Sequence, residues 1–184
     1  MLFFDNKKNR FFSRKIFKSI ESKLYGIDEE LANEYLIWLD KKTEYLKKTY
    51  EKEGYGVQPD NLTQGDIVWV EFGINVGTEL SDYKTKGHYG VVWKVDLGNV
   101  IIIPLSSNKT NGSSLTYDIG IIDGLNDNDK THSYLKLDAI RSISKRRIGR
   151  MNNKENGKLV LKEDKIEIIR RAIFDSFVSE KNKI

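Results

Sequence analysis

The chain has 184 residues, of which 39% are hydrophobic and 32% are charged, so it is long enough to bury the core of one domain. It contains no cysteine, which excludes a disulfide framework, a thiolate metal site and cysteine catalysis. Its 31 basic and 27 acidic residues give a net charge of +4, which permits a polyanionic partner without requiring one.

The sequence contains no run of the ~20 apolar residues that a membrane span needs. The first four residues, Met1 to Phe4, run directly into charged residues, whereas a secretory signal places its charge before a long apolar core. We therefore expect a cytoplasmic protein without a membrane partner.

Residues 1–62 are predicted to form a helical extension. A short helix is expected at about residues 13–24, and a second helix follows Asp28, a candidate N-cap, and stops at Gly54. The stretch from Lys7 to Lys23 contains seven basic residues and one acid. Residues 54–62 are predicted to form a linker because glycine, proline, asparagine and aspartate gather there.

After the linker, the hydrophobic pattern changes to that of strands. The clearest candidates are residues 66–72, 89–95 and 100–103, and Gly98-Asn99 fits a two-residue hairpin turn in which glycine takes a positive φ. Shorter candidates follow at 115–121, 134–137, 140–144 and 158–161. Short strands at this spacing predict a small antiparallel barrel. A helix at about residues 163–178 is expected to cover it with a stripe formed by Ile166, Ile169, Ile173 and Phe177.

Three stretches have a composition suited to chemistry. The loop at residues 73–88 contains Glu79, Lys86 and His88, which is a set suited to proton transfer and to stabilising negative charge, although a solvated loop has the same composition. The strand that ends at residues 104–108 places Ser106 and Ser107 at its polar end, where serine and asparagine also favour plain turns.

The third stretch, residues 141–150, contains five basic residues and no acid. Such a patch binds phosphates, and nearby aromatic residues such as Tyr89 can stack on bases. A basic hairpin that serves solubility or an acidic protein partner fits the same composition. Residues 127–132 only faintly suggest a calcium loop, because His132 stands where the sharp turn needs glycine, so we expect no metal site there.

The sequence resembles the MazF/PemK toxins of bacterial type II toxin–antitoxin systems. The resemblance covers residues 63–184 and is found in Gly65-Asp66-Ile67-Val68-Trp69-Val70, in Val76-Gly77-Thr78-Glu79, in Val91-Val92, in residues 100–107 and in residues 137–149. It implies an SH3-like barrel with helices, an α+β fold. It also implies a homodimer that cleaves single-stranded RNA, including mRNA, without a metal or other cofactor and is blocked by a cognate antitoxin.

The resemblance also indicates site residues. Glu79 lies in a segment similar to the family's Gly-Ser-Glu, and Ser106 is similar to its active-site threonine or serine. The family's catalytic arginine is absent. Keeping Val91-Val92 in register places His88 at the arginine position, whereas a one-residue slip would place Tyr89 there and turn the buried face of the strand outward.

These residues predict a mechanism in which the RNA 2′-hydroxyl attacks the phosphate, which leaves a 2′,3′-cyclic phosphate and a 5′-hydroxyl. His88 would act as acid or base, Glu79 would orient it or exchange protons with it, and Lys86 would offset the charge of the phosphorane. Ser106 would hold the phosphate, and the remaining predicted RNA contacts are Ser107, Tyr89, Arg141, Lys145, Arg146, Arg147 and Arg150.

Two other interpretations stay open. The barrel, without the arginine, would be a non-catalytic binder of nucleic acid or protein, or a toxin directed at DNA gyrase. Alternatively, the extension dominates and the chain is an interaction protein. Within the extension, the basic first part offers RNA contacts, while the amphipathic helix is expected to pack on the barrel, on a second copy or on the antitoxin.

Overall fold

The computed structural model describes residues 2–55, 58–59, 61–125, 130–152 and 154–179. The chain divides into two compact units, Met1–Glu44 and Tyr45–Ile184. This division lies earlier in the sequence than the predicted boundary at residue 62, because the last turns of the second long helix belong with the sheet. Half of the candidate calcium loop, residues 127–129, lies outside the described residues.

The first unit contains a short 3-10 turn at Phe3–Asp5, helix α1 (Lys7–Leu24) and most of helix α2 (Glu29–Tyr50). Helix α1 begins six residues before its predicted start, because the Asn6 side chain caps it by accepting from the Lys8 amide at 2.9 Å. The predicted N-cap of α2 is confirmed, since Asp28 Oδ1 accepts from the Leu31 amide at 3.1 Å. Gly54 does not end α2, which stops at Tyr50 before Lys52 takes a φ of 56°.

The second unit is built on one antiparallel sheet, which confirms the α+β class. Among the described residues its elements are the strands β1 (Asp66–Val70), β2 (His88–Asp96), β3 (Asn99–Ser106), β4 (Thr116–Ile121), β5 (His132–Lys136), β6 (Arg141–Ser144), β7 (Ile148–Gly149) and β8 (Leu159–Val160), followed by helix α3 (Glu163–Phe177). The longer predicted strands are all present within a few residues of their expected bounds. Strand β7 was missed, because two residues are too few to show a period.

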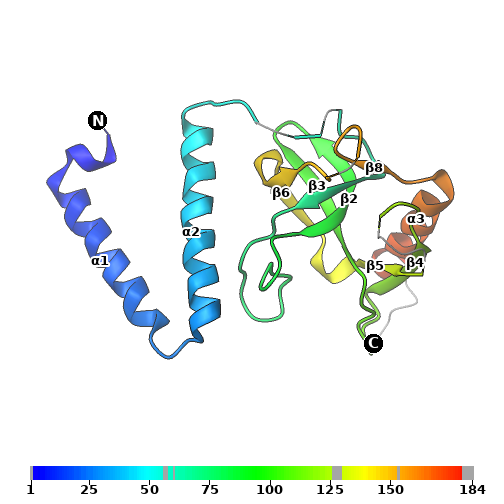
Figure 1. Ribbon diagram of the computed structural model, residues 1–184, viewed down its shortest axis with the longest axis horizontal. Coiled ribbons are helices and arrows are strands. Elements are labelled where there is room, and N and C mark those ends of the chain that lie inside the picture. Colours follow the sequence, from blue (N-terminus) through cyan, green and yellow to red (C-terminus); the bar gives the residue numbers. More distant parts are fainter. Residues whose placement is uncertain (1, 56–57, 60, 126–129, 153, 180–184) are drawn as a thin grey trace. The chain divides into compact units, whose positions relative to one another are not determined.

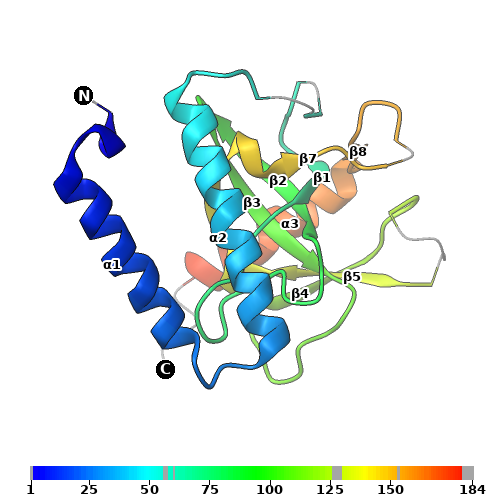
Figure 2. The same cartoon turned by 60° about the vertical axis from the view of Figure 1, so that its left-hand side comes forward.

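Strand β3 lies at the centre of the sheet and changes its partner halfway along. One edge pairs with β2, while the other edge pairs with β6 over Asn99–Ile102 and with β5 at Leu105 and Ser106. The change falls at Pro104, whose ring nitrogen has no hydrogen to donate to a neighbouring strand. Figure 2 shows the β4–β5 pair as a ribbon running across the ends of the other strands.

The β2–β3 turn differs from its prediction by one residue. Asp96 pairs with Asn99, so the turn residues are Leu97 and Gly98 rather than Gly98 and Asn99. Leu97 takes the positive φ, at 40°. The hairpin was therefore correctly expected, but the residue assigned the unusual backbone conformation was wrong.

Both faces of the sheet are apolar, which explains why β1 and β3 contain so few polar residues. On one face Ile67, Ile103 and Leu105 join the core beneath α3, and on the other Val68, Val70 and Phe72 join Val100 and Ile102. In Figure 1, α3 lies beside β4 and β5 on the first of these faces. These opposed clusters fix the strand register, because a one-residue slip would exchange them.

The predicted stripe of α3 is largely confirmed. Ile166 and Ile169 are buried, and Ile173 is partly buried against the same core. Phe177 is 54% exposed, so its predicted place in the stripe is wrong, whereas Ala172, three residues after Ile169, is fully buried. The helix ends at Phe177.

A buried ion pair ties the start of β1 to the segment before β8. The Asp66 side chain is 1% exposed, and its Oδ2 accepts from Lys158 Nζ at 2.7 Å and from the Thr63 amide at 2.6 Å. Its Oδ1 has no hydrogen-bond partner among the described residues. Lys158 is therefore the cation that compensates the buried negative charge of Asp66, and its own side chain is only 11% exposed.

Candidate active site

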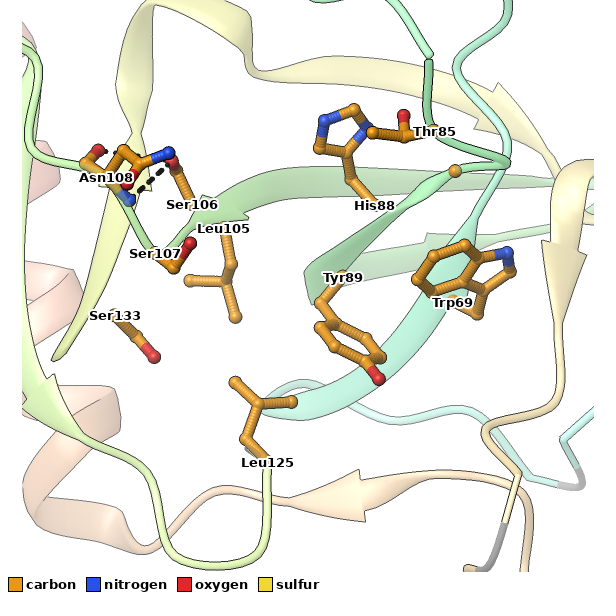
Figure 3. A pocket seen from close by; sticks show the side chains of 11 residues that line it. Trp69, Thr85, His88, Tyr89, Leu105, Ser106, Ser107, Asn108, Leu125 and Ser133 are labelled. Atoms are coloured by element: carbon orange, nitrogen blue, oxygen red, sulfur yellow. Dashed lines mark hydrogen bonds between the residues drawn. The ribbon is translucent and has the colours of Figure 1, made fainter. Parts of the chain in front are cut away.

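An open pocket of about 310 Å³ lies where β1 and β3 end and β2 begins, near the long β1–β2 loop. Figure 3 shows its lining side chains, with His88, Tyr89 and Trp69 on one side and the serines on the other. The lining comprises Trp69, Thr85, Gly87, His88, Tyr89, Leu105, Ser106, Ser107, Asn108, Leu125 and Ser133. Four residues predicted for the site, His88, Tyr89, Ser106 and Ser107, therefore meet in one hollow.

His88 is held by a buried carboxylate. Its Nδ1 lies 2.9 Å from Asp82 Oδ1, and the other oxygen of Asp82 accepts the Gly73 amide at 2.5 Å. Asp82 is 6% exposed, whereas the His88 side chain is 22% exposed and reaches the pocket. A carboxylate on Nδ1 fixes the ring orientation and leaves Nε2 as the nitrogen available to a ligand.

His88 and Ser106 come from neighbouring strands. Gly90 pairs with Pro104, and both His88 and Ser106 stand two residues beyond that pair, where Ser106 pairs with Tyr134 of β5 instead. From sequence positions 18 residues apart, the hairpin therefore places both residues in the lining of one pocket, on different sides of it.

Two neighbours fix where β2 enters the site. Gly87 has a φ of 144°, and a Cβ there would lie 2.6 Å from the Val70 carbonyl oxygen and 2.7 Å from Trp69 Nε1, so a larger residue would push the strand away. The buried Phe72 ring meets the His88 ring edge-on, with centroids 6.1 Å apart. The imidazole therefore contacts the Phe72 ring on one side and the Asp82 carboxylate at Nδ1.

Ser106 takes part in turn chemistry as well as lining the pocket. Its Oγ accepts the Asn108 amide at 3.0 Å and lies 3.1 Å from the Asn108 carbonyl oxygen, to which it donates. These bonds are dashed in Figure 3. Both interpretations of this segment are therefore correct. It forms a turn, and the turn also places the two serines in the lining of the pocket.

Glu79 and Lys86 do not line this pocket. Both are exposed on the β1–β2 loop, which Figures 1 and 2 show extending well beyond the strands that it joins. The carboxylate bonded to His88 is Asp82, three residues after Glu79, so the predicted pairing of Glu79 with His88 is corrected. Asp82 reaches the imidazole because its backbone turns back on Gly73, whose carbonyl accepts the Asp82 amide at 2.9 Å.

The predicted basic patch lies outside the pocket, and its arginines bind backbone carbonyls. Arg147 donates to the carbonyls of Glu71 and Phe72, and Arg150 donates to that of Gln58 at 2.9 Å. Burial, and then the nearby charge of Arg141, lower the pKa of the Arg147 guanidinium from its ordinary value. A carbonyl does not neutralise a guanidinium, so RNA attraction by this patch stays a prediction.

The other members of the patch are dispersed in the same way. The Arg141 guanidinium lies over the Phe72 ring, 5.3 Å from its centroid. The backbone amide of Lys145 donates to the Gly98 carbonyl, and its own carbonyl accepts from Gln58. The contacts of these basic residues therefore involve Phe72, the β2–β3 turn and Gln58.

Arg146 closes the C-terminal end of α2. Its guanidinium donates to the carbonyls of Lys48 at 3.2 Å, Glu53 at 2.6 Å and Gly54 at 2.9 Å, and to Thr49 Oγ1 at 2.9 Å. The last carbonyls of a helix have no partner within the helix, so a fork of donors is suited to this end.

Replacing Arg146 by alanine is expected to loosen the last turn of α2. Charged hydrogen bonds each contribute ~1.5–3 kcal/mol, so hydrogen-exchange protection of the amides at residues 47–50 should fall at least about ten-fold. Arg146→Lys, which keeps the charge but not the fork, should give an intermediate loss. Unchanged protection in Arg146→Ala would show that the helix end is held by other contacts.

A second hollow of about 540 Å³ shares three lining residues with the pocket. Trp69, Tyr89 and Leu125 border both, and the second hollow adds Arg150, Asn152 and Lys154. The rings of Trp69 and Tyr89 meet edge-on with centroids 5.2 Å apart. Tyr89, a predicted RNA contact, therefore lines both hollows next to the bonded pair His88 and Asp82.

Sequence reasoning missed Asp82, Thr85, Asn108 and Ser133. The signal for Asp82 was present, since a second carboxylate stood six residues before the chosen histidine in the same loop. Ser133 was not recognisable, because β5 joins the site only through the partner change of β3.

No group of three His, Asp or Glu side chains in the described ranges is placed to hold a metal ion. In the same ranges, no helix is both long and apolar enough to cross a bilayer.

The fold and the pocket define a small α+β protein with a histidine–carboxylate pair in an open site. A family model described as the PemK-like, MazF-like toxin of type II toxin–antitoxin systems matches residues 63–177, which is more than half of the chain. The chain belongs to this toxin family. No curated protein matches it, and the N-terminal helices precede the matched residues.

Proposed function

We propose that the protein is a toxin that cleaves single-stranded RNA without a metal, using the RNA 2′-hydroxyl as the nucleophile. The observation that supports this most directly is the His88 imidazole, bonded through Nδ1 to buried Asp82 and lining a pocket together with Ser106. Membership of the toxin family supports the toxin role and an antitoxin partner, and the match says nothing about the missing arginine.

In the proposed reaction, His88 Nε2 removes the proton from the 2′-hydroxyl. The oxygen attacks the adjacent phosphorus, the bond to the 5′-oxygen breaks, and the imidazolium returns the proton to that leaving oxygen. The products are a 2′,3′-cyclic phosphate and a 5′-hydroxyl, so protons and charges balance. Asp82 supports the cationic imidazolium between the two transfers because it is an anion at 2.9 Å.

Hydroxyl groups in the pocket are suited to holding the phosphate. Ser106, Ser107 and Thr85 line it together, and each offers an O–H donor to a non-bridging phosphate oxygen. Lys86, two residues before His88 on the exposed loop, adds a positive charge to the approach of the RNA. We assign Glu79 no contact with the reacting atoms.

Incubation of the full-length protein with mixed-sequence single-stranded RNA in EDTA tests this proposal. We expect fragments with cyclic phosphate and 5′-hydroxyl ends, formed equally well with and without added Mg²⁺. A 3′ end that carries the cyclic phosphate cannot be ligated. After the phosphate is removed enzymatically, the same end can be ligated, which identifies it. Cleavage that depends on Mg²⁺, or products with 5′-phosphates, would contradict it.

A non-catalytic barrel is the second candidate, and the missing arginine favours it. In that case the protein would bind RNA in a salt-sensitive manner and leave it intact, since phosphate contacts depend on counterion release. Inhibition of DNA gyrase without RNA cleavage would identify the gyrase-directed alternative.

A further inference from the structure

The first unit has no core of its own. Among the described residues 2–44, none is buried. Large apolar side chains remain in solvent, among them Phe11 at 73%, Phe12 at 57%, Phe17 at 63% and Ile37 at 68% exposed. Helices of this length gain most of their stability from packing an apolar face against another element, so this unit needs a cover.

Helix α1 has two distinct faces. Phe12, Ile16 and Ile20 follow one another at four-residue intervals, and Phe17 and Leu24 widen the same stripe. Lys8 and Lys15 are seven residues apart, so they lie on one line beside Phe12. The stripe is therefore an apolar face flanked by positive charge.

The charges of the two helices are complementary. Residues 7–24 contain seven basic residues and one acid, which gives +6, whereas residues 28–40 contain five acids and no basic residue, which gives −5. Glu34 and Asp40 lie three residues to either side of the exposed Ile37, so they flank it on α2.

The helix α2 of the same copy does not cover α1. It begins at Glu29, five residues after α1 ends at Leu24, and yet Phe12 and Phe17 stay more than half exposed. Figures 1 and 2 agree that the two helices diverge from the connecting loop. The apolar face of α1 is therefore left uncovered by the acidic helix of its own hairpin, and a second copy of the chain offers the same acidic and apolar face.

We propose that the occupant is a second copy of this chain, in which α1 of one protomer packs along residues 28–40 of the other, and the reverse. Such a contact is isologous, so each hairpin covers its partner's hairpin and the four helices form a bundle. Contact between two α1 helices would place +6 against +6, which makes the crossed arrangement the favoured one. This interface lies outside the family-matched residues and does not depend on RNA cleavage.

The absence of cysteine allows a direct test in the full chain. One copy carries Ile16→Cys, a second copy with a different tag carries Ile37→Cys, and mild oxidation links the two only where their Cα atoms come within ~7 Å. Lys18→Cys is the matched control, because two residues turn the helix by ~200° and place the thiol on the opposite face. We expect at least about ten-fold more mixed-tag dimer with Ile16→Cys than with Lys18→Cys.

Exchanging the charges of the two helices tests whether the cross-link reports a specific interface or random collisions between copies. Lys8→Glu with Lys15→Glu in the Ile16→Cys copy should lower the yield of mixed-tag dimer about ten-fold. Glu34→Lys with Asp40→Lys in the Ile37→Cys copy should restore it, which a merely unfolded helix would not allow. Circular dichroism confirms that each variant keeps its helices.

Equal yields for Ile16→Cys and Lys18→Cys, or a failure of the exchanged charges to restore the yield, would overturn the proposal. An α1 that binds an anionic lipid surface, RNA or the antitoxin in place of a second copy would give that negative result. RNA cleavage by these same samples is measured separately, so failure of this interface and failure of the proposed nuclease activity are distinguishable.

Discussion

Replacing His88 by alanine is expected to lower the rate of RNA cleavage by about 10²–10⁴-fold, which is the usual contribution of a positioned acid–base group. The variant removes the only imidazole among the residues lining the pocket and leaves Ser106 and Ser107 in place. The rate is measured in EDTA with a fluorescent single-stranded RNA under single-turnover conditions. RNA binding by the variant should stay within about three-fold of the parent.

The chain offers a matched control in its other histidine. His132 Nδ1 also lies 2.9 Å from a carboxylate, that of Asp118, but this pair stands on β4 and β5 and lines neither the pocket nor the second hollow. His132→Ala should therefore keep the rate within about three-fold. A His88→Ala protein that cleaves as fast as His132→Ala would remove His88 from the mechanism.

Asp82→Asn distinguishes a positioning role from a merely structural one. The amide is similar in shape and can still accept from the Gly73 amide, but it has no charge to support an imidazolium. We expect a rate between those of the parent and His88→Ala. Glutamate, which restores the charge, should recover part of the rate.

Replacing Lys158 by methionine should lower the free energy of unfolding by about 3–5 kcal/mol, because it leaves the Asp66 carboxylate buried without its cation. Asp66 is fully buried, and Lys158 Nζ is the charged group 2.7 Å from its Oδ2. Guanidinium unfolding followed by tryptophan fluorescence measures the change. The sheet contains Trp69 and Trp93, which report on this region.

The double variant Asp66→Asn, Lys158→Met is the control for this prediction. It removes both charges, and asparagine still offers an oxygen to the Thr63 amide, so most of the lost stability should return. If Lys158→Met alone costs less than about 1 kcal/mol, water reaches Asp66 and the pair is not buried in solution.

The sheet was predictable because burial on both faces leaves a strong pattern. Residues 66–70 and 100–103 are almost wholly apolar, and the structure places alternate residues of these strands in two separate cores. Details that depend on distant partners were not predictable. Leu97 at positive φ is tolerated because the β2–β3 pairing imposes the turn, and α1 extends to Lys7 because one side chain, Asn6, caps it.

The site was predictable in part, for a related reason. His88 and Ser106 were chosen from the family resemblance, and both line the same pocket. The partner of His88 depends on how a 17-residue loop, residues 71–87, folds back on Gly73, and no local period reports that. Arg146 and Arg147 suggested RNA contacts by composition, whereas their carbonyl partners come from α2 and from the end of β1.

The bonds of Arg146 set a limit on how far the chain can be shortened. Its acceptors begin at Lys48, and a few residues earlier the Tyr45 hydroxyl donates to Glu71 Oε2 at 2.6 Å. Truncation at the family boundary would delete these acceptors and leave a forked cation and a glutamate facing water. A minimal autonomous fragment of this toxin therefore has to start upstream of Tyr45, because the final turns of α2 are bonded to the sheet-containing unit.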